Sequence, residues 1–427
     1  MFSSNNISKQ LINANQQNIE VYPLSKNATY SIQIKNSIKD IQEVWDTVAP
    51  KENLFLQSTY LQTLENFPPE KMSFRYIIFY KENIPVGIAY NQIFKLNVED
   101  SLQQSNEEEA NKSNCLIRAF SNAAKKWFIK RAEFNLLICG NLLLTGEYGF
   151  HFKVPINEQQ TASLIQDALD ALQNILDKEQ TKVSVHLLKD YKIETSEELK
   201  EQLKKETYHP FLMQPSMYMN IRPNWDCFDN YLGDMSSKYR VRAKRARKKG
   251  DAIVKKELSL EEIEAHEERI YELYKMIADG AGFNAFLLHK QYFTELKRDL
   301  GNCYKLTGYF IDGQLIAFYT AIFNYKEMDA HFLGVDGAYN RAHQVYLNIL
   351  YDLVNRAIEG RVERIDFART ALEIKSSVGA VSQDMLCFFK HRSTLSSKVL
   401  QLVFDSLNPK EEWQPRSPFK SDVIPVG

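Results

Sequence analysis

The sequence predicts an α+β protein in which a mixed, mostly antiparallel sheet is flanked by helices, and in which this arrangement occurs twice. Residues 308–389 indicate a hairpin with an Asp-Gly turn, a strand, a loop, an amphipathic helix and two further strands. The first half repeats this order, with a hairpin whose second strand contains Gly87, then a glycine-bearing strand, a helix and a strand. A chain of 427 residues is long enough for two such units.

Composition along the chain predicts where these units begin and end. Residues 1–20 are rich in Asn and Gln and lack periodicity, so we expect a flexible N-terminal arm. The first unit is expected over 21–217, interrupted by a polar, acidic and mobile insertion at 97–114. The second unit is expected over 218–408. Four prolines in 409–427 predict a tail that is either ordered by contact or disordered.

Charge and cysteine usage narrow the class of protein. A net charge of −1 gives the whole chain no attraction to nucleic acid, and no DNA-binding signature is present. The five cysteines are scattered and form no C-x-x-C pair, which argues against a disulfide framework and against a metal site. The absence of a signal-like segment and of a run of 18 apolar residues predicts a cytoplasmic protein. Peripheral contact with the inner face of the membrane is compatible with this expectation.

The strand, loop and helix over 333–347 predict an anion-binding site. The first turn of a helix has unpaired N–H groups and a partial positive charge, which suits the phosphates of CoA or phosphopantetheine. The residues expected to bind such a donor are Gly334, Val335, Gly337, Asn340, Arg341, His343 and Gln344. An ordinary connection between a strand and a helix would have the same pattern.

A strongly basic helix precedes this region. Residues 238–249 contain eight Lys and Arg side chains in twelve positions, among them Arg240, Arg242 and Arg245. The helix is either a solvated face or a dock for an anion. The candidate partners are tRNA, an acidic acyl carrier protein, the 3′-phosphate of CoA and anionic lipid headgroups, and the sequence does not choose between them.

Four segments together resemble the GNAT-like acyltransferases, in particular the branch of Fem-type peptidoglycan aminoacyltransferases and BioF2-like acetyltransferase domains. They are SSKYRVRAKRARKKG, the hairpin GYFIDGQLIAFY, the helix after LGVDGAYN, and DFART followed by IKSSVGA. The resemblance implies two tandem GNAT-like units and an acyltransferase enzyme. In this reading the first unit is structural or shapes the acceptor side, because it lacks an arginine-bearing loop like the one after Val335.

The resemblance also implies roles for single residues. A Lys at the position of Lys375 lies in the donor site of Fem-type relatives, where an ammonium offsets negative charge; a surface Lys is the alternative. Asp366 is expected either to face the cleft or to be a buried hydrogen-bond acceptor. His331 is a candidate general base or a structural residue of its strand. Tyr319 is a candidate for protonating the leaving thiolate, as tyrosines do in many GNAT enzymes. Further base candidates are His343, Asp336 and Glu373, and further tyrosine candidates are Tyr309 and Tyr346.

The expected reaction is direct attack of a primary amine on an acyl-CoA or acyl carrier protein thioester, because no Cys has a nucleophile context with His and Asp. The acceptor would be of lipid or amino-sugar type, and Phe283 and Phe286 are expected to line an acyl or acceptor pocket, or to be a hydrophobic staple. One alternative is aminoacyl transfer from tRNA to a peptidoglycan precursor, disfavoured because residues 259–300 carry no long heptad. Another is a non-catalytic protein that docks an acidic partner on 236–249.

Overall fold

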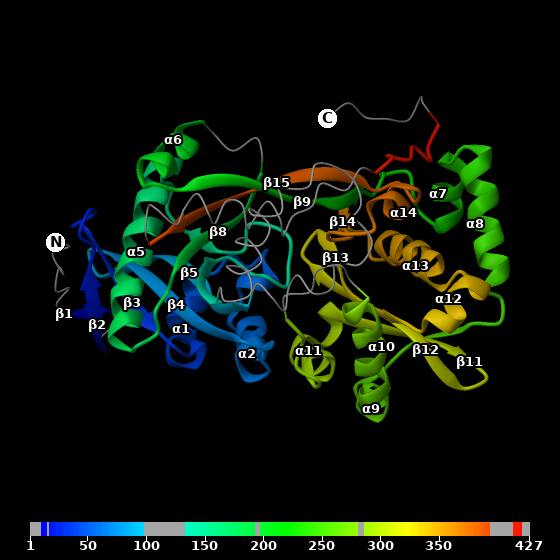
Figure 1. The fold of residues 1–427 in the computed structure, drawn as a ribbon, viewed down its shortest axis with the longest axis horizontal. Helices are drawn as coiled ribbons and strands as arrows, with labels where there is room; N and C mark the ends of the chain where they lie inside the picture. The colour runs from blue at the N-terminus through cyan, green and yellow to red at the C-terminus, as the bar shows by residue number, and fades with distance from the viewer. Residues whose placement is uncertain are drawn as a thin grey trace, which may run out of the picture.

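The computed structural model describes residues 10–14, 17–97, 133–192, 197–280, 286–392 and 413–420. Its strands form one long twisted sheet that crosses the whole molecule (Figure 1). From one edge to the other the strands are β1 (Gln10–Ala14), β2 (Gln17–Pro23), β3 (Tyr30–Lys35), β4 (Met72–Lys81), β5 (Ile84–Asn97), β6 (Glu133–Cys139), β8 (Val185–Lys192), β15 (Val381–His391), β9 (His209–Asn220), β14 (Arg364–Asp366), β13 (Glu327–Val335), β12 (Gln314–Asn324), β11 (Tyr304–Ile311) and β10 (Val254–Glu257), with β7 (Phe150–Phe152) paired to β5.

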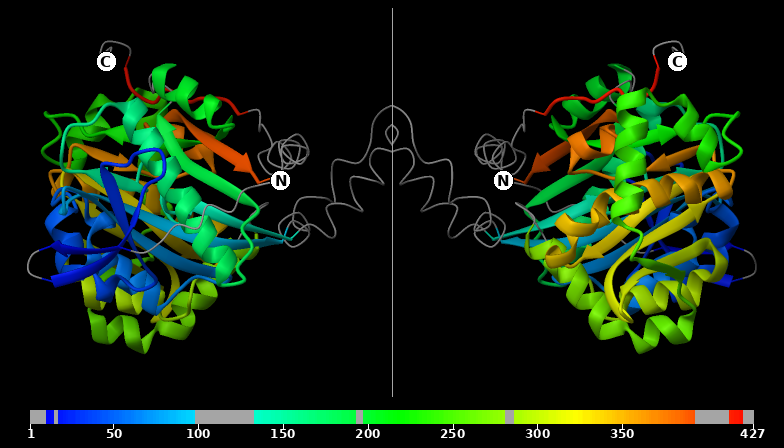
Figure 2. Two further views of the ribbon diagram at one scale, coloured as in Figure 1. Left: turned by 90° about the vertical axis from the view of Figure 1, so that its left-hand side faces the viewer. Right: turned by 90° about the vertical axis from the view of Figure 1, so that its right-hand side faces the viewer.

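Helices cover both faces of this sheet (Figures 1 and 2). They are α1 (Gln42–Val48), α2 (Ser58–Asn66), α5 (Glu158–Lys178), α6 (Glu197–Lys205), α7 (Phe228–Asp234), α8 (Ser237–Lys249), α9 (Leu260–Ala265), α10 (Glu267–Asp279), α11 (Tyr292–Leu300), α12 (Gly337–His343), α13 (Val345–Glu359) and α14 (Leu372–Ser376). Three short 3₁₀ turns lie at Ile38–Asp40, Leu54–Leu56 and Gly301–Cys303. The predicted α+β class, with a mixed and mostly antiparallel sheet flanked by helices, is confirmed.

The two halves of the sheet repeat one order of elements. In the first half the hairpin β4–β5 is followed by β6, then by α5, and then by β8, which runs parallel to β6. In the second half the hairpin β11–β12 is followed by β13, then by α13, and then by β14, which runs parallel to β13. The other strand pairs of the described sheet are antiparallel.

The halves are joined by exchanged strands at the centre of the sheet. β9 follows the elements of the first half in sequence, yet it pairs with β14 of the second half. β15 comes last in sequence and pairs with both β8 and β9. The expected junction at residue 217 lies within β9. This exchange leaves a continuous hydrogen-bonded sheet through the middle of the molecule.

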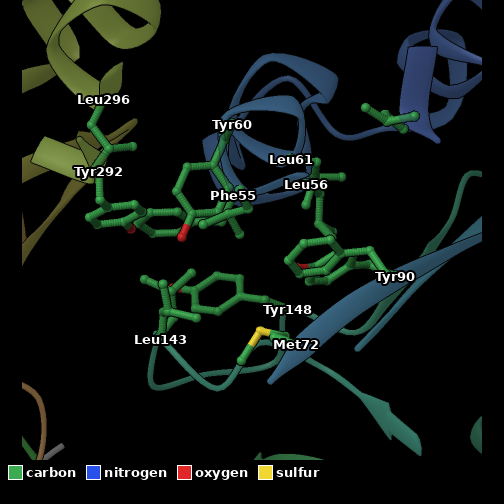
Figure 3. Packing of buried hydrophobic residues seen from close by; sticks show 14 of the residues in the cluster. Phe55, Leu56, Tyr60, Leu61, Met72, Tyr90, Leu143, Tyr148, Tyr292 and Leu296 are labelled. Atoms are coloured by element: carbon green, nitrogen blue, oxygen red, sulfur yellow. The ribbon is translucent and has the colours of Figure 1, made fainter. Parts of the chain in front are cut away.

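Apolar side chains gather in three clusters. One lies between α5, α6 and the first half of the sheet, and a second between α7, α8, α13 and the second half. The third contains residues from α1, α2, α10 and α11 and therefore belongs to both halves. Figure 3 shows its aromatic centre, where Tyr292 of α11 lies beside Tyr60 of α2 and near Tyr148. Burial of large aromatic surfaces makes such a cluster a strong contact between the halves.

Both ends of the chain differ from a simple arm and tail. Residues Gln10–Ala14 and Gln17–Pro23 form the antiparallel hairpin β1–β2 where a flexible arm was expected. In the tail, Phe419 makes a bridge to Met235 and its ring packs against Trp225 and the guanidinium of Arg222. The insertion expected at 97–114 lies outside the described residues from 98 onward. No helix in the described parts of the chain is both long and apolar enough to cross a bilayer.

Candidate active site

The parallel strands β13 and β14 separate at the centre of the second half. They pair only at Glu327–Arg364, Met328–Ile365 and Asp329–Asp366, where β14 ends. β13 continues to Val335 with β12 alone as its strand partner in the described sheet. Backbone N–H and C=O groups on the β14 side of this stretch therefore face a fork between the strands. An extended ligand with amide groups can pair with such an edge.

Two carboxyl groups stand at the apex of the fork. Asp329 and Asp366 are direct neighbours in the register of β13 and β14 and so point to the same face of the sheet. Asp366 accepts hydrogen bonds from Ser216 Oγ at 2.9 Å and from the Ala368 N–H at 2.6 Å. Asp329 is only 7% exposed and has no hydrogen-bond or ion-pair partner within the described structure. Asp366 is half-buried, and two neighbouring carboxyls, one of them buried, favour retention of a proton.

Burial is the main cause of the shifted pKa values of this pair. It raises the pKa of Asp329 well above the ordinary range, and the negative charges of Asp366 and Glu327 add to the effect. Burial also raises the pKa of Asp366, against the opposing influence of its hydrogen bonds from Ala368 and Ser216. The sequence analysis selected Asp366 and missed Asp329. The sequence signal for Asp329 is an acidic residue within an apolar strand, two positions before His331 and therefore on the same face of the sheet.

Lys375 fixes the backbone that follows Asp366. Its Nζ donates to the carbonyl oxygens of Arg369 at 2.5 Å and Ala368 at 3.3 Å. Ala368, Thr370 and Ala371 all have positive φ, a conformation that is uncommon for residues other than glycine. Burial lowers the pKa of Lys375 to about 7, while the charge of Asp366 acts in the opposite direction. The structure therefore brings Asp366 and Lys375 together around one strained segment.

His331 and Tyr319 lie in different apolar clusters, on opposite faces of the sheet. The Nε2 of His331 is 2.7 Å from the hydroxyl of Tyr292, inside the aromatic cluster between the halves. Burial lowers the pKa of His331 to about 3, so its imidazole is neutral at physiological pH. Tyr319 packs near Tyr309 in the cluster beneath α13, on the opposite face of the sheet.

The expected donor loop contains a short helix, α12, before α13 begins. The Asp336 carboxylate caps α12 by accepting from the Ala338 N–H at 3.0 Å, and Arg269 of α10 holds it at 2.8 Å. The Asn340 side chain accepts from the Tyr346 N–H, in the first turn of α13, at 3.0 Å. Gln344 joins the two helices in a left-handed conformation. Gly337, Asn340 and Arg341 are exposed, whereas Gly334 and Val335 are buried.

Gly334 is required for close packing at this place. A Cβ atom on Gly334 would approach the Phe318 ring to 2.4 Å and the Leu273 backbone to 2.6 Å. α10 can therefore pack directly on β13 only because this residue has no side chain.

The basic helix α8 lies against α12 and α13 (Figure 1). The Nδ1 of His343 is 3.1 Å from the Lys249 carbonyl oxygen, and the Asn348 amide donates to the Ala246 carbonyl oxygen at 2.8 Å. On its outer face Arg242 and Arg245 are exposed and Arg240 is half-buried, and none of the three has an ion-pair partner among the residues that the structure describes. The C-terminal end of α8 therefore adjoins the expected donor loop, whereas Arg242 lies with Glu373 and Arg416 around a second pocket.

A pocket of about 550 Å³ lies between the two halves, at the amino ends of β13 and β14 and therefore opposite the end at which the fork opens. Asn324 fixes one wall, because its side-chain oxygen accepts from the Leu54 N–H of the first half at 2.7 Å. The charges of Asp329, Asp366, Glu327 and Arg364 all act on the Tyr148 hydroxyl at this place. The lining residues are Glu52, Asn53, Tyr148, Asn220, Asn324, Tyr325, Lys326, Glu327, Glu363 and Arg364.

Of the two phenylalanines expected in an acyl or acceptor pocket, Phe286 packs against Phe94, with ring centroids 6.1 Å apart, beside the cluster shared by the halves. Phe283 lies outside the described residues. No group of three His, Cys, Asp or Glu side chains in the described ranges is arranged to hold a metal ion.

Comparison with known proteins identifies the segment that contains the fork. Residues 237–376 match the family model of the acetyltransferase (GNAT) domain. No curated protein sequence matches the chain at a significant level. The solved structures that are similar to the chain include these three. FemX is 11% identical, with a TM-score of 0.49 over 87% of this chain and 99% of that chain.

The second is the C-terminal domain of a putative lysylphosphatidylglycerol synthetase from Agrobacterium fabrum, which is 6% identical with a TM-score of 0.45 over 87% of this chain and 96% of that one. The third is a tandem GNAT protein from the clavulanic acid biosynthesis pathway, which is 7% identical with a TM-score of 0.46 over 85% and 99% of the two chains. Likeness at this level does not bear on substrate or mechanism.

Proposed function

We propose, from the premise that the chain is an acyltransferase with a GNAT domain at residues 237–376, that it transfers an acyl group from a thioester of CoA or acyl carrier protein to a primary amine. The observation that carries this proposal is the fork between β13 and β14 with Asp329 and Asp366 at its apex. A thioester extended along the free edge of β13 has its carbonyl carbon at the apex, next to these carboxyls.

The donor lies with its phosphate end toward α12, α13 and α8. An extended pantetheine arm carries amide groups that pair with the free backbone edge of Ala330–Val335. The exposed Arg341 of α12, together with Arg242 and Arg245 of α8, supplies positive charge for phosphates or for an acidic carrier protein.

The acceptor amine enters from the pocket on the opposite side. Its ammonium loses a proton to the carboxyl pair, whose raised pKa makes the carboxylate form a stronger base than an ordinary aspartate. The neutral nitrogen attacks the thioester carbonyl carbon, the C–N bond forms, and the C–S bond breaks. The departing thiolate takes the remaining proton that the nitrogen loses, which leaves an amide and a free thiol.

The first half of the chain serves the acceptor side in this proposal. It contributes Glu52, Asn53 and Tyr148 to the pocket. The first half has its own parallel pair, β6 and β8, and the loop 140–149 follows β6. Lys189 of β8 holds this loop, because its Nζ donates to the Leu144 carbonyl oxygen at 2.7 Å. Buried side chains of this loop, among them Leu143 and Tyr148, fill the shared cluster (Figure 3).

The donor class is tested by thermal stability of the purified protein with CoA, palmitoyl-CoA, an acylated carrier protein and bulk tRNA. A ligand at 100 times its dissociation constant stabilises by about 2.7 kcal/mol, which is a readable shift in Tm. We expect stabilisation by the thioesters, followed by thiol release when amines are added. Stabilisation by tRNA alone would replace the proposal with aminoacyl transfer, and no stabilisation by any of the four would remove it.

A further inference from the structure

The charged side chains of the pocket between the halves are unevenly compensated. Lys326 pairs with Glu363 at 2.6 Å on the exposed rim. The Arg364 guanidinium lies 4.0 Å from the Tyr218 ring centroid and donates to the Gln383 side chain at 3.0 Å. Both cations of the lining are therefore engaged.

Of the three acids in the lining, Glu363 pairs with Lys326, whereas the other two have no such partner among the described residues. Glu52 and Glu327 have no hydrogen-bond or ion-pair partner in the part of the chain that the structure describes. Further in, the same holds for Asp329, which is more than nine-tenths buried. Asp329 lies two residues along β13 from Glu327 and therefore on the same face of the sheet, and Glu327 lines the pocket. A buried carboxylate without a partner is costly, so this arrangement favours a ligand that brings positive charge and N–H donors.

The lining also excludes one kind of acceptor. Every side chain that lines the pocket carries a polar or charged group, and no aliphatic side chain is among them. Its apolar surface is that of the Tyr148 and Tyr325 rings, and polar groups converge on it from every lining residue. Sites of this kind hold small polar ligands better than a long hydrocarbon chain.

We propose that the acceptor is a small, water-soluble amine, cationic when free, which binds between the halves with its ammonium directed from Glu52 and Glu327 toward Asp329. This inference rests on the proposed function, because it assigns the second substrate of the same site. Glu52 lies in the connection between α1 and α2 of the first half, and Glu327 lies in β13 of the second half. The first half therefore helps to determine acceptor specificity. The inference also replaces the sequence-based expectation of a lipid-type acceptor, while an amino sugar remains within the class.

The test measures amine binding without any acyl donor. Melting temperature is followed for the full chain with putrescine, lysine and glucosamine, and with octylamine as the lipid-like amine. We expect at least one soluble amine to stabilise the protein and octylamine to have no effect. Glu327→Gln should raise the Kd of that soluble amine about tenfold, which is the usual effect of losing one charge-assisted hydrogen bond.

Two further variants make the result specific. Glu52→Gln removes the acid contributed by the first half, lies at an exposed position that tolerates the change, and should also weaken binding. Glu198→Gln is the matched control, because Glu198 is exposed on α6 at the far end of the sheet (Figure 1). Stabilisation by octylamine alone, by no amine, or equally in wild type and both pocket variants would overturn the inference.

The outcome is separable from that of the proposed function. Binding of a soluble amine that depends on Glu327, with no turnover from any thioester, would remove the acyltransfer proposal and leave the assignment of the amine site. Thioester turnover with octylamine alone would keep the acyltransfer proposal and remove the inference about the acceptor.

Discussion

At the scale of single residues, Asp329 has opposite effects on stability and on the proposed chemistry. Its folded pKa lies above the unfolded value, so the folded state holds a proton that the unfolded state has lost. Stability therefore falls as pH rises through the interval from the unfolded pKa, about 3.9, to the raised folded pKa. Above that interval the buried carboxylate destabilises the protein, yet only the carboxylate form can accept a proton from the acceptor amine.

This conflict predicts the behaviour of Asp329→Asn. Above the raised pKa, the variant should have a higher Tm than wild type, because a neutral amide of the same shape replaces a buried charge. Its kcat should fall about 100-fold or more, since a general base contributes at least that much. The measurements are thermal unfolding from pH 5 to pH 9 and thiol release at saturating substrates.

The matched control is Asp40→Asn, which removes an exposed carboxylate in the first half and should change neither quantity. Retention of wild-type kcat by Asp329→Asn would assign the base elsewhere. A lower Tm at high pH would mean that Asp329 has a partner in the native protein.

At the scale of elements, α8 is the clearest case in which charge and position act together. Its C-terminal end contacts α12 and the start of α13, and its outer face carries the cations Arg242 and Arg245. The double variant Arg242→Glu/Arg245→Glu should raise the KM for the acyl donor about tenfold, because reversal of two exposed charges costs on the order of 1–2 kcal/mol. The kcat should stay near wild type, and the salt dependence of donor binding should weaken.

Lys204→Glu/Lys205→Glu on α6 is the control for this experiment, because it reverses two exposed cations far from the fork. An unchanged donor KM in the α8 variant, or an equal rise in the control, would show that α8 is only a solvated face.

The elements also show how far the sequence could predict the structure. Hairpins, the apolar stripe of α13 and the basic helix were predictable because their signals lie within a few consecutive residues. α12 was missed, because Asp336 and Gly337 are ordinary signals of a loop. The pairing of Asp329 with Asp366 could not be read, because it depends on the register of two strands separated in sequence by α13.

The exchange of β9 and β15 between the halves could not be predicted from the sequence either. Each strand has a local pattern that predicts a strand, but the choice of neighbour depends on contacts between segments far apart in the chain. Lys375 shows the same limit at the candidate site. The resemblance implies that its ammonium lies at the donor, and this stays a prediction; its contacts with the carbonyls of Ala368 and Arg369 could not be predicted from the sequence.

At the scale of the whole molecule, a buried ionic cluster connects the halves behind the fork. Asp190 of β8 accepts from Lys189 and from Arg369, and the Arg369 Nε donates to the Gln214 carbonyl oxygen at 2.8 Å. Although burial alone raises it, Arg369 and Lys189 hold the pKa of Asp190 below its ordinary value. Arg369 belongs to the segment whose carbonyls Lys375 binds, directly after Asp366, so the first half of the chain positions the apex of the fork.

Arg369→Met tests this connection. Removal of one partner from a buried ion cluster should destabilise the folded protein by about 3–5 kcal/mol. It should also lower kcat more than it raises either KM, because it loosens the strained segment beside Asp366 and leaves the donor loop and the pocket walls intact. Chemical denaturation and steady-state kinetics at saturating substrates measure the two effects.

Arg392→Met is the matched control, because Arg392 also joins elements distant in sequence but its pair with Asp177 is largely exposed, at 2.8 Å. Exposed pairs contribute at most about 1 kcal/mol, so this variant should stay close to wild type in both measurements. A loss of stability without a change in kcat for Arg369→Met would show that the ionic cluster stabilises the fold but does not position the apex of the fork for catalysis. A parallel loss of both would mean that the strand-exchanged halves act as one catalytic unit.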